Sequence, residues 1–117
     1  MEGVAYGLRD SLELLAAIGD RPRGGRVSGG GAASDLWLRI VASALELRLE
    51  RIEIEDGSAY GAALLGGVAA GVFADVDDAA SRCVRVTETI DPDDAWTAAY
   101  RDGYARFTRA YPAVRPL

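Results

Sequence analysis

Residues 26–37, RVSGGGAASDLW, join a short apolar strand to an amphipathic helix through three consecutive glycines. Glycine has no Cβ, so backbone N–H groups in such a turn approach a ligand closely. The helix that begins near Ser34 directs the positive end of its dipole toward the same turn. The stretch therefore indicates a nucleotide or phosphate ligand at Gly29, Gly30 and Gly31. An isolated glycine triplet, however, is more often only a tight structural turn.

Bulk composition limits the chain to one modest domain. Of its 117 residues, 50% are hydrophobic, which is enough to bury a core. The formal net charge is −5, and the 13 basic residues are spread along the chain instead of forming a continuous basic stripe. We therefore expect no nucleic-acid partner.

Missing residue types exclude several kinds of catalytic site. Every basic residue is an arginine, and the sequence holds neither lysine nor histidine. A Walker-type phosphate loop needs its lysine, and a Ser/His/Asp triad needs its histidine. Most zinc sites need histidine or several cysteines, whereas Cys83 is the only cysteine, so we expect no metal ligands in this chain. A single cysteine is typical of a reducing compartment, which predicts a cytoplasmic protein.

Residues 57–74 form an uncharged run that is rich in glycine and alanine. The run is short for a membrane span, so we interpret it as a buried helix of a soluble protein, from Ser58 through Val72. Each glycine weakens a helix by roughly 1 kcal/mol relative to alanine, which indicates that close packing compensates. The first residues show neither a basic leader nor a signal-peptide core, so no export signal is expected.

Apolar periodicity and capping residues predict helices and strands in alternation. Residues 49–54 are rich in β-formers, although their apolar alternation slips phase near Arg51. Residues 84–90 are extended or irregular. The expected elements are helices over 4–18, 34–46, 58–72 and 75–83, short strands at 26–28 and 49–54, and a final helix capped by Asp91 and ending before Pro112.

This order predicts a helix-rich α/β fold with about two short strands. Two short strands make a poor sheet, and parallel strands flanked by helices normally belong to a larger sheet that is buried on both faces. The chain therefore resembles a part of a larger unit.

Other charged and aromatic residues have structural interpretations. Adjacent Arg9 and Asp10 face different directions on a helix and are expected to be solvated charges without a catalytic role. Arg26 and Arg39 either reach a phosphate, face the solvent or pair with carboxylates. A stripe of aromatic residues at helical spacing in the last helix is expected to serve packing. It comprises Trp96, Tyr100, Tyr104, Phe107 and Tyr111.

Three blocks together resemble a known family, the C-terminal domain of the FGGY carbohydrate kinases. Residues 2–13, EGVAYGLRDSLE, are similar to the family's second signature helix. The SGGGA turn that begins at Ser28 resembles its adenosine-binding turn. Residues 59–65, AYGAALL, resemble the small-residue helix that closes the nucleotide site. The order and spacing of the blocks agree with the family, and the similarity extends over nearly the whole chain.

Within the family, the turn favours the xylulose kinases. Glycerol kinases tend to carry an aspartate where this chain has Ser28 and an asparagine where it has Ser34. The SGGGA turn followed by Leu36 and Trp37 is more similar to a pentulose kinase. Another FGGY sugar or polyol kinase, such as a glycerol kinase, is the alternative within the family. A non-catalytic α/β interaction module is the alternative outside it.

The resemblance implies a fold and a two-domain kinase whose substrates bind between the domains. FGGY kinases belong to the actin-like ATPase, ribonuclease H-like superfamily and bind sugar and nucleotide in the cleft between their domains. They transfer the γ-phosphoryl group of ATP, with Mg²⁺, to a sugar hydroxyl. Residues 1–117 would form a single partial domain, the nucleotide-binding segment, with the catalytic aspartate and the sugar contacts upstream.

The resemblance also implies roles for four residues of this chain. Gly29, Gly30 and Gly31 would offer backbone contacts to the ADP moiety, and Ser34 would lie beside the ribose or adenine. No catalytic residue is expected, so the chain alone should be inactive. The expected partners are a nucleotide and, through the missing domain, a sugar; no membrane partner is expected, and a homodimer is one possible assembly.

Overall fold

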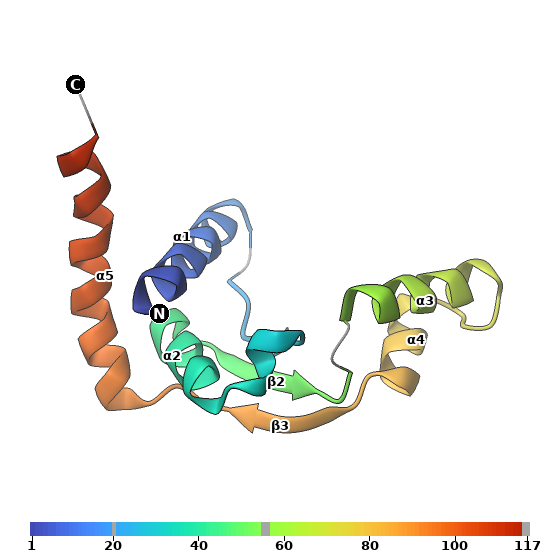
Figure 1. Cartoon of the computed structure of the whole chain (residues 1–117). Coiled ribbons are helices and arrows are strands. Elements are labelled where there is room, and N and C mark those ends of the chain that lie inside the picture. The colour runs from blue at the N-terminus through green and yellow to red at the C-terminus, as the bar shows by residue number, and fades with distance from the viewer. Residues whose placement is uncertain (20, 55–56, 116–117) are drawn as a thin grey trace.

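The computed structural model describes residues 1–19, 21–54 and 57–115, apart from the side chain of Tyr111 (Figure 1). Residues 20, 55, 56, 116 and 117 lie outside this description, so part of the predicted loop after the first helix is not covered. The elements in chain order are α1 (Glu2–Ile18), β1 (Gly24–Val27), the 3₁₀ turn η1 (Gly30–Ala33), α2 (Asp35–Leu45), β2 (Arg48–Ile52), α3 (Gly57–Ala69), α4 (Val76–Cys83), β3 (Val86–Ile90) and α5 (Asp94–Val114).

The described strands form one three-stranded sheet in the order β1-β2-β3. β1 runs parallel to β2, with Gly24 opposite Arg48. β2 runs antiparallel to β3, with Leu49 opposite Ile90. The third strand, β3, lies in the segment 84–90 that the sequence predicted as extended or irregular. Only Ile90 of the five residues of β3 is buried, and within the described sheet β3 pairs with β2.

The hydrophobic core lies between this sheet and α1 and α2. Leu38 in α2 and Leu49 in β2 are each only 2% exposed. Leu12 is the buried leucine of α1, whereas Val4 and Leu8, which share its helical periodicity, are exposed. The main cluster comprises Leu12, Leu38, Val41, Ala42, Leu45, Leu47, Leu49 and Ile90.

The long helix α5 packs across α1 and α2 through aromatic side chains, as the sequence predicted. Tyr6 of α1 meets the Tyr100 ring edge-on, with the ring centroids 6.1 Å apart. Gly103 lies so close to Tyr6 that a Cβ there would collide with the phenol. The Tyr104 hydroxyl donates a hydrogen bond of 2.6 Å to Asp10. The part of the stripe that the structure describes, 96–107, therefore serves packing.

Both ends of α5 differ from the prediction. The N-cap is Asp93, whose Oδ1 accepts a hydrogen bond from the Trp96 amide, instead of Asp91. The Asp93 amide itself donates to the hydroxyl of Ser43, a fully buried residue of α2, and this bond sets where the helix begins. At the other end, α5 continues through Pro112 to Val114. Only two residues follow Pro112 in the helix, so the lost N–H affects only its last turn.

The glycine-rich helix α3 is exposed, so the prediction of a buried helix was wrong for the described part of the chain. None of its residues is buried, and it packs mainly on α4. In Figure 1, α3 and α4 extend together to one side of the sheet. At Gly61 and Gly66 nothing lies within 4 Å of where a Cβ would stand. Close packing is found at Gly67, where a Cβ would collide with the Phe73 ring, and at Gly57, but not along the whole helix. α3 ends at Ala69 instead of Val72.

Arg9 and Glu46 join the C-terminus of α2 to α1 and α5. The Arg9 side chain is only 11% exposed and donates to the Ala44 carbonyl, at 2.9 Å, and to Glu46, at 3.0 Å. Glu46 is the left-handed C-cap of α2, with φ +54°, and also accepts from Arg101 of α5. Asp10 is likewise engaged, by Tyr104. The expectation that Arg9 and Asp10 are solvated charges was therefore wrong.

This network makes stability depend on pH in the acid range. Hydrogen bonding from Arg101 and then from Arg9 lowers the pKa of Glu46 from the usual 4.5 to about 2. Because the folded-state pKa is the lower one, the stabilisation is fully present above about pH 4.5 and is lost as the pH falls toward 2.

We expect Glu46→Gln to lower the free energy of unfolding by about 2 kcal/mol at pH 7. Urea unfolding at a series of pH values should show this difference shrinking from pH 4.5 downward. Glu50→Gln is the control, since Glu50 forms only a 3.5 Å pair with Arg26 across the sheet surface. An equal loss in both variants, or a loss independent of pH, would contradict the assignment.

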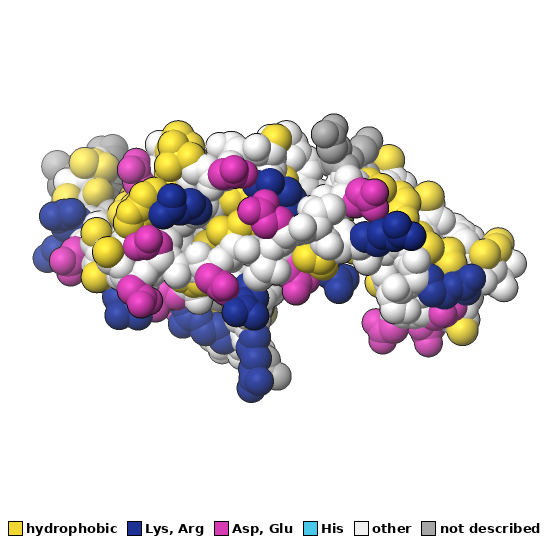
Figure 2. All heavy atoms as spheres, turned by 90° about the horizontal axis from the view of Figure 1, so that it is seen from below, with side chains coloured by type: hydrophobic (Ala, Val, Ile, Leu, Met, Phe, Trp, Pro, Cys, Tyr) yellow, Lys and Arg dark blue, Asp and Glu magenta, His cyan; other side chains and the backbone are white. Residues whose placement is uncertain are grey.

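Charges of both signs are interspersed over much of the face shown in Figure 2, and basic side chains gather in a column at its lower edge. No helix in the described ranges is both long enough and apolar enough to cross a membrane.

Candidate nucleotide site

The predicted glycine turn connects β1 to α2 in the structure. Gly29 has φ +84°, a left-handed conformation that L side chains rarely adopt. The Gly29 carbonyl accepts the Ala32 amide at 2.9 Å, which closes the 3₁₀ turn η1, and Ala32 is buried beneath it. A glycine is thus required at position 29 by the backbone itself. The following helix begins at Asp35, close to the predicted start.

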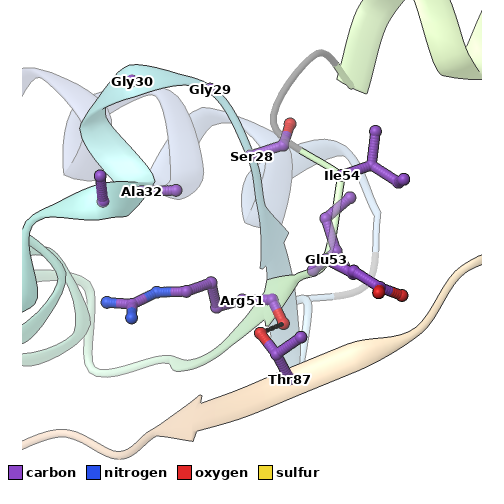
Figure 3. A pocket seen from close by; sticks show the side chains of 10 residues that line it. Ser28, Gly29, Gly30, Ala32, Arg51, Glu53, Ile54 and Thr87 are labelled. Carbon is purple, nitrogen blue, oxygen red and sulfur yellow. Dashed lines mark hydrogen bonds between the residues drawn. The ribbon is translucent and has the colours of Figure 1, made fainter.

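A hollow of about 330 Å³ lies between this turn and the sheet (Figure 3). Its walls come from the glycine turn, from the end of β2 with the residues that follow, and from β3. α3 begins at its edge, where Gly57 lies so close to Ser28 that a Cβ would collide with the hydroxyl. The lining residues are Ser28, Gly29, Gly30, Ala32, Ala33, Arg51, Ile52, Glu53, Ile54 and Thr87.

The structure brings two of the four predicted site residues to this hollow. Gly29 and Gly30 line it. Gly31 faces the other way, against the Trp37 indole, where a Cβ would lie 3.3 Å from Nε1. The Ser34 hydroxyl caps α2 by accepting the Trp37 amide at 3.2 Å. Contact of these four residues with a ligand stays a prediction, and the geometry favours Gly29 and Gly30 most directly.

The far wall was not predicted as part of a site. It contains residues 51–54, from β2 and the segment just after it, and Thr87 from β3; Glu53 adds a carboxylate to this wall. The sequence did contain a signal for Arg51, because the apolar alternation slips phase near this residue. The structure has a register shift in the pairing of β2 with β3 at the same place, between Arg51 and Ile52. No sequence signal indicates Thr87, whose hydroxyl donates to the Arg51 carbonyl at 3.2 Å.

The positive charge of Arg51 is balanced by two carboxylates. Its Nη2 lies 2.5 Å from Asp35 and its Nη1 lies 2.7 Å from Glu88. The hydrogen bond to Asp35 is the main cause that raises the pKa of Arg51, so the guanidinium stays charged. The site therefore presents no net positive charge from this residue.

The two other arginines considered for phosphate binding are paired elsewhere. Arg39 lies 3.5 Å from Asp93 and stacks on the Trp96 ring at 4.7 Å. Arg26 lies 3.5 Å from Glu50. Both side chains are also more than half exposed, so the structure supports the solvent-facing and the carboxylate-paired interpretations together.

A mostly apolar hollow with a few polar groups is typical of a site for a flat heterocycle. Here the apolar part is formed by alanine and isoleucine side chains, and the polar part by the Ser28 and Thr87 hydroxyls, the turn backbone and two charged residues, Arg51 and Glu53. These groups can enclose an uncharged ring and hydrogen-bond to its edge. The arrangement suits the nucleoside end of a nucleotide better than its phosphates.

The family comparison decides what kind of domain this is. Residues 1–70 match the model of the FGGY family of carbohydrate kinases, C-terminal domain. The chain belongs to this family. The matched range contains the glycine turn and the β2 wall of the hollow, whereas β3 with Thr87 and the helix α5 lie beyond it.

The similarity to individual kinases extends beyond the residues that the family model matches. It is 26% identical to xylulose kinase of Staphylococcus epidermidis over all 117 residues, which are 24% of that protein. Over 94 residues, 80% of the chain, it is 34% identical to glycerol kinase of Haemophilus influenzae, of which they form 18%. The crystal structure of xylulose kinase from Rhodospirillum rubrum matches with a TM-score of 0.82 and 32% identity, over 98% of this chain and 23% of that one.

These comparisons confirm the predicted α/β class with the actin-like, ribonuclease H-like fold of the FGGY C-terminal domain. The chain spans about a quarter of the length of the xylulose kinases that it matches.

Proposed function

We propose that this FGGY segment is the adenine-nucleotide-binding part of an ATP-dependent carbohydrate kinase, most similar to the xylulose kinases. The observation that carries the proposal is the hollow beside Gly29 and Gly30, because it lies at the turn that resembles the family's adenosine-binding turn. In the intact kinase, ATP supplies the transferred phosphoryl group, and Mg²⁺ neutralises charge on its phosphates. The residues of this chain would enclose the nucleoside end.

The proposed acceptor is a pentulose. The similarity to xylulose kinases extends over the whole chain, whereas that to the glycerol kinase of Haemophilus influenzae extends over 80% of it. We place the catalytic aspartate and the sugar contacts in a part of the kinase outside these 117 residues. The proposed location is the cytoplasm, and a homodimer stays a possible assembly.

The surface of α1 supports the proposal that residues 1–117 form only part of a domain. Val4, Leu8, Leu15 and Ile18 are spaced along one face of α1, and each is between 45% and 85% exposed. β1 is an edge strand of the described sheet, so one side of its backbone is unpaired there. Monomeric proteins rarely leave such apolar stretches uncovered. Further strands and helices of the kinase would cover both features.

Calorimetric titration of the 117-residue chain with ADP and Mg²⁺ tests the proposal. We expect saturable binding of ADP and of adenosine, and no ATP-dependent phosphorylation of D-xylulose by this chain alone. If neither ligand binds, the nucleotide role is contradicted and a non-catalytic interaction module becomes the better account. If D-xylulose is phosphorylated rapidly, the catalytic aspartate lies within these residues, against the proposal.

A further inference from the structure

Arg51 connects the elements that form the walls of the hollow. Its side chain extends from β2 beneath the glycine turn (Figure 3) and is 23% exposed. One carboxylate that it contacts, Asp35, lies in the first turn of α2, directly after the glycine turn. The other, Glu88, lies on β3 next to the lining residue Thr87. A single guanidinium therefore joins the turn side of the hollow to its sheet side.

The geometry of these contacts indicates that Arg51 holds the two walls apart at a fixed distance and does not itself bind a charged ligand. A planar guanidinium that bonds two carboxylates at once has a fixed orientation, which a lysine ammonium would not have. The Nε of Arg51 is buried without a hydrogen-bond partner among the described residues. Burying an unpaired N–H group is unfavourable. The two ion pairs thus hold the side chain in place against this cost.

We propose that Arg51 is a positioning residue of the nucleotide site, which fixes the distance between the glycine turn and the β2–β3 wall and neutralises Asp35 and Glu88. The inference rests on the proposed nucleotide-binding function. Without Arg51, the two carboxylates next to the hollow would lose their cation. Their negative charge would repel the phosphates of ADP more strongly than it would affect uncharged adenosine.

This difference between the two ligands separates positioning from simple loss of structure. A variant that merely unfolds part of the time binds ADP and adenosine more weakly by the same factor. Loss of Arg51 should instead weaken ADP more than adenosine. Arg51→Lys retains the charge but not the planar fork, so it should restore the ratio of the two affinities without restoring the full affinity.

The experiment compares ADP and adenosine affinities of the 117-residue chain with those of Arg51→Met, Arg51→Lys and Arg26→Met. We expect Arg51→Met to weaken ADP binding by roughly three- to thirtyfold. Arg26→Met is the matched control, because Arg26 also pairs with a carboxylate across the sheet, at 3.5 Å, but does not line the hollow. Its affinities should remain unchanged. Wild-type ADP affinity in Arg51→Met, or an equal loss in Arg26→Met, would overturn the inference.

Hydrogen exchange in the ligand-free protein tests the positioning role independently of the proposed function. The Ala32 amide, bonded to the Gly29 carbonyl, should exchange faster in Arg51→Met than in the wild type and in Arg26→Met. Glu88→Gln serves as a second variant in case Arg51→Met does not fold, because it removes only one of the two ion pairs and Glu88 is half-exposed. It should increase the exchange rate of the Ala32 amide by a smaller factor. Unchanged exchange at Ala32 would refute the inference. Absence of ADP binding to the wild type would instead refute the proposed function.

Discussion

Replacing Gly30 with leucine is expected to weaken ADP binding by about a hundredfold or more, which is about 2.7 kcal/mol, with little change in the free energy of unfolding. Gly30 lines the hollow, and nothing lies within 4 Å of where its Cβ would stand. Its φ lies outside the left-handed region. A leucine side chain should therefore occupy ligand space without straining the backbone. Calorimetry with ADP and urea unfolding measure the two quantities.

The choice of position is essential to this test. Gly29 has φ +84°, so a substitution there would strain the backbone and confuse a binding effect with a folding effect. Gly7→Leu is the control, because Gly7 lies on α1, away from the hollow, and is equally free of neighbours within 4 Å. If Gly30→Leu binds ADP as tightly as Gly7→Leu does, the ligand lies elsewhere.

Arg9→Met is expected to destabilise the chain by about 3 kcal/mol, because it removes the cation from a largely buried ion pair. The Ala44 carbonyl would lose the donor that Arg9 provides at 2.9 Å. Glu46 would keep only its contact with Arg101, and its carboxylate is 24% exposed. Chemical denaturation at pH 7 measures the loss.

A more exposed pair, between Glu13 of α1 and Arg21 beyond the end of that helix, provides the comparison for Arg9. Arg21 lies 3.0 Å from Glu13, and both side chains are more than a third exposed. Arg21→Met should therefore cost less than about 0.5 kcal/mol. Similar losses in the two variants would show that burial of Arg9 contributes nothing special, contrary to the description of the helix packing.

Local patterns predicted the elements that carry their own signals. The glycine turn and the helix after Ser34 follow from φ requirements and capping, which act within a few residues. The Ser34 cap and the positive φ of Gly29 are both present in the structure. The aromatic stripe of α5 also followed from helical spacing, although its partner, Tyr6 of α1, could not be inferred from spacing.

Features that depend on distant residues were not predictable in this way. β3 forms because β2 offers it an edge, since only Ile90 of its five residues is buried. The start of α5 depends on the buried Ser43 hydroxyl, 50 residues earlier in the chain. Glycine content alone suggested burial for α3, but burial requires an extended neighbouring surface, and among the described elements α3 packs mainly on the short helix α4.

The candidate site shows the same division. The turn itself was predicted because it has a local sequence signature, whereas the positions of Gly31 next to the Trp37 indole and of the Ser34 hydroxyl at the Trp37 amide were not. The role of Arg51 depends on Asp35 and Glu88, which are 16 residues before it and 37 after it in the sequence numbering. Contacts over such separations become visible only when the sheet is formed.

The most direct test of the central claim is a residue-resolved titration of the ¹⁵N-labelled 117-residue chain with ADP, followed by NMR. The account predicts saturable shifts of the Gly29, Gly30 and Arg51 amides, with none at the apolar hollow between α3 and α4, which Leu64 and Val68 line. Shifts confined to the α3–α4 hollow, or no saturable shift at the glycine turn, would contradict the account.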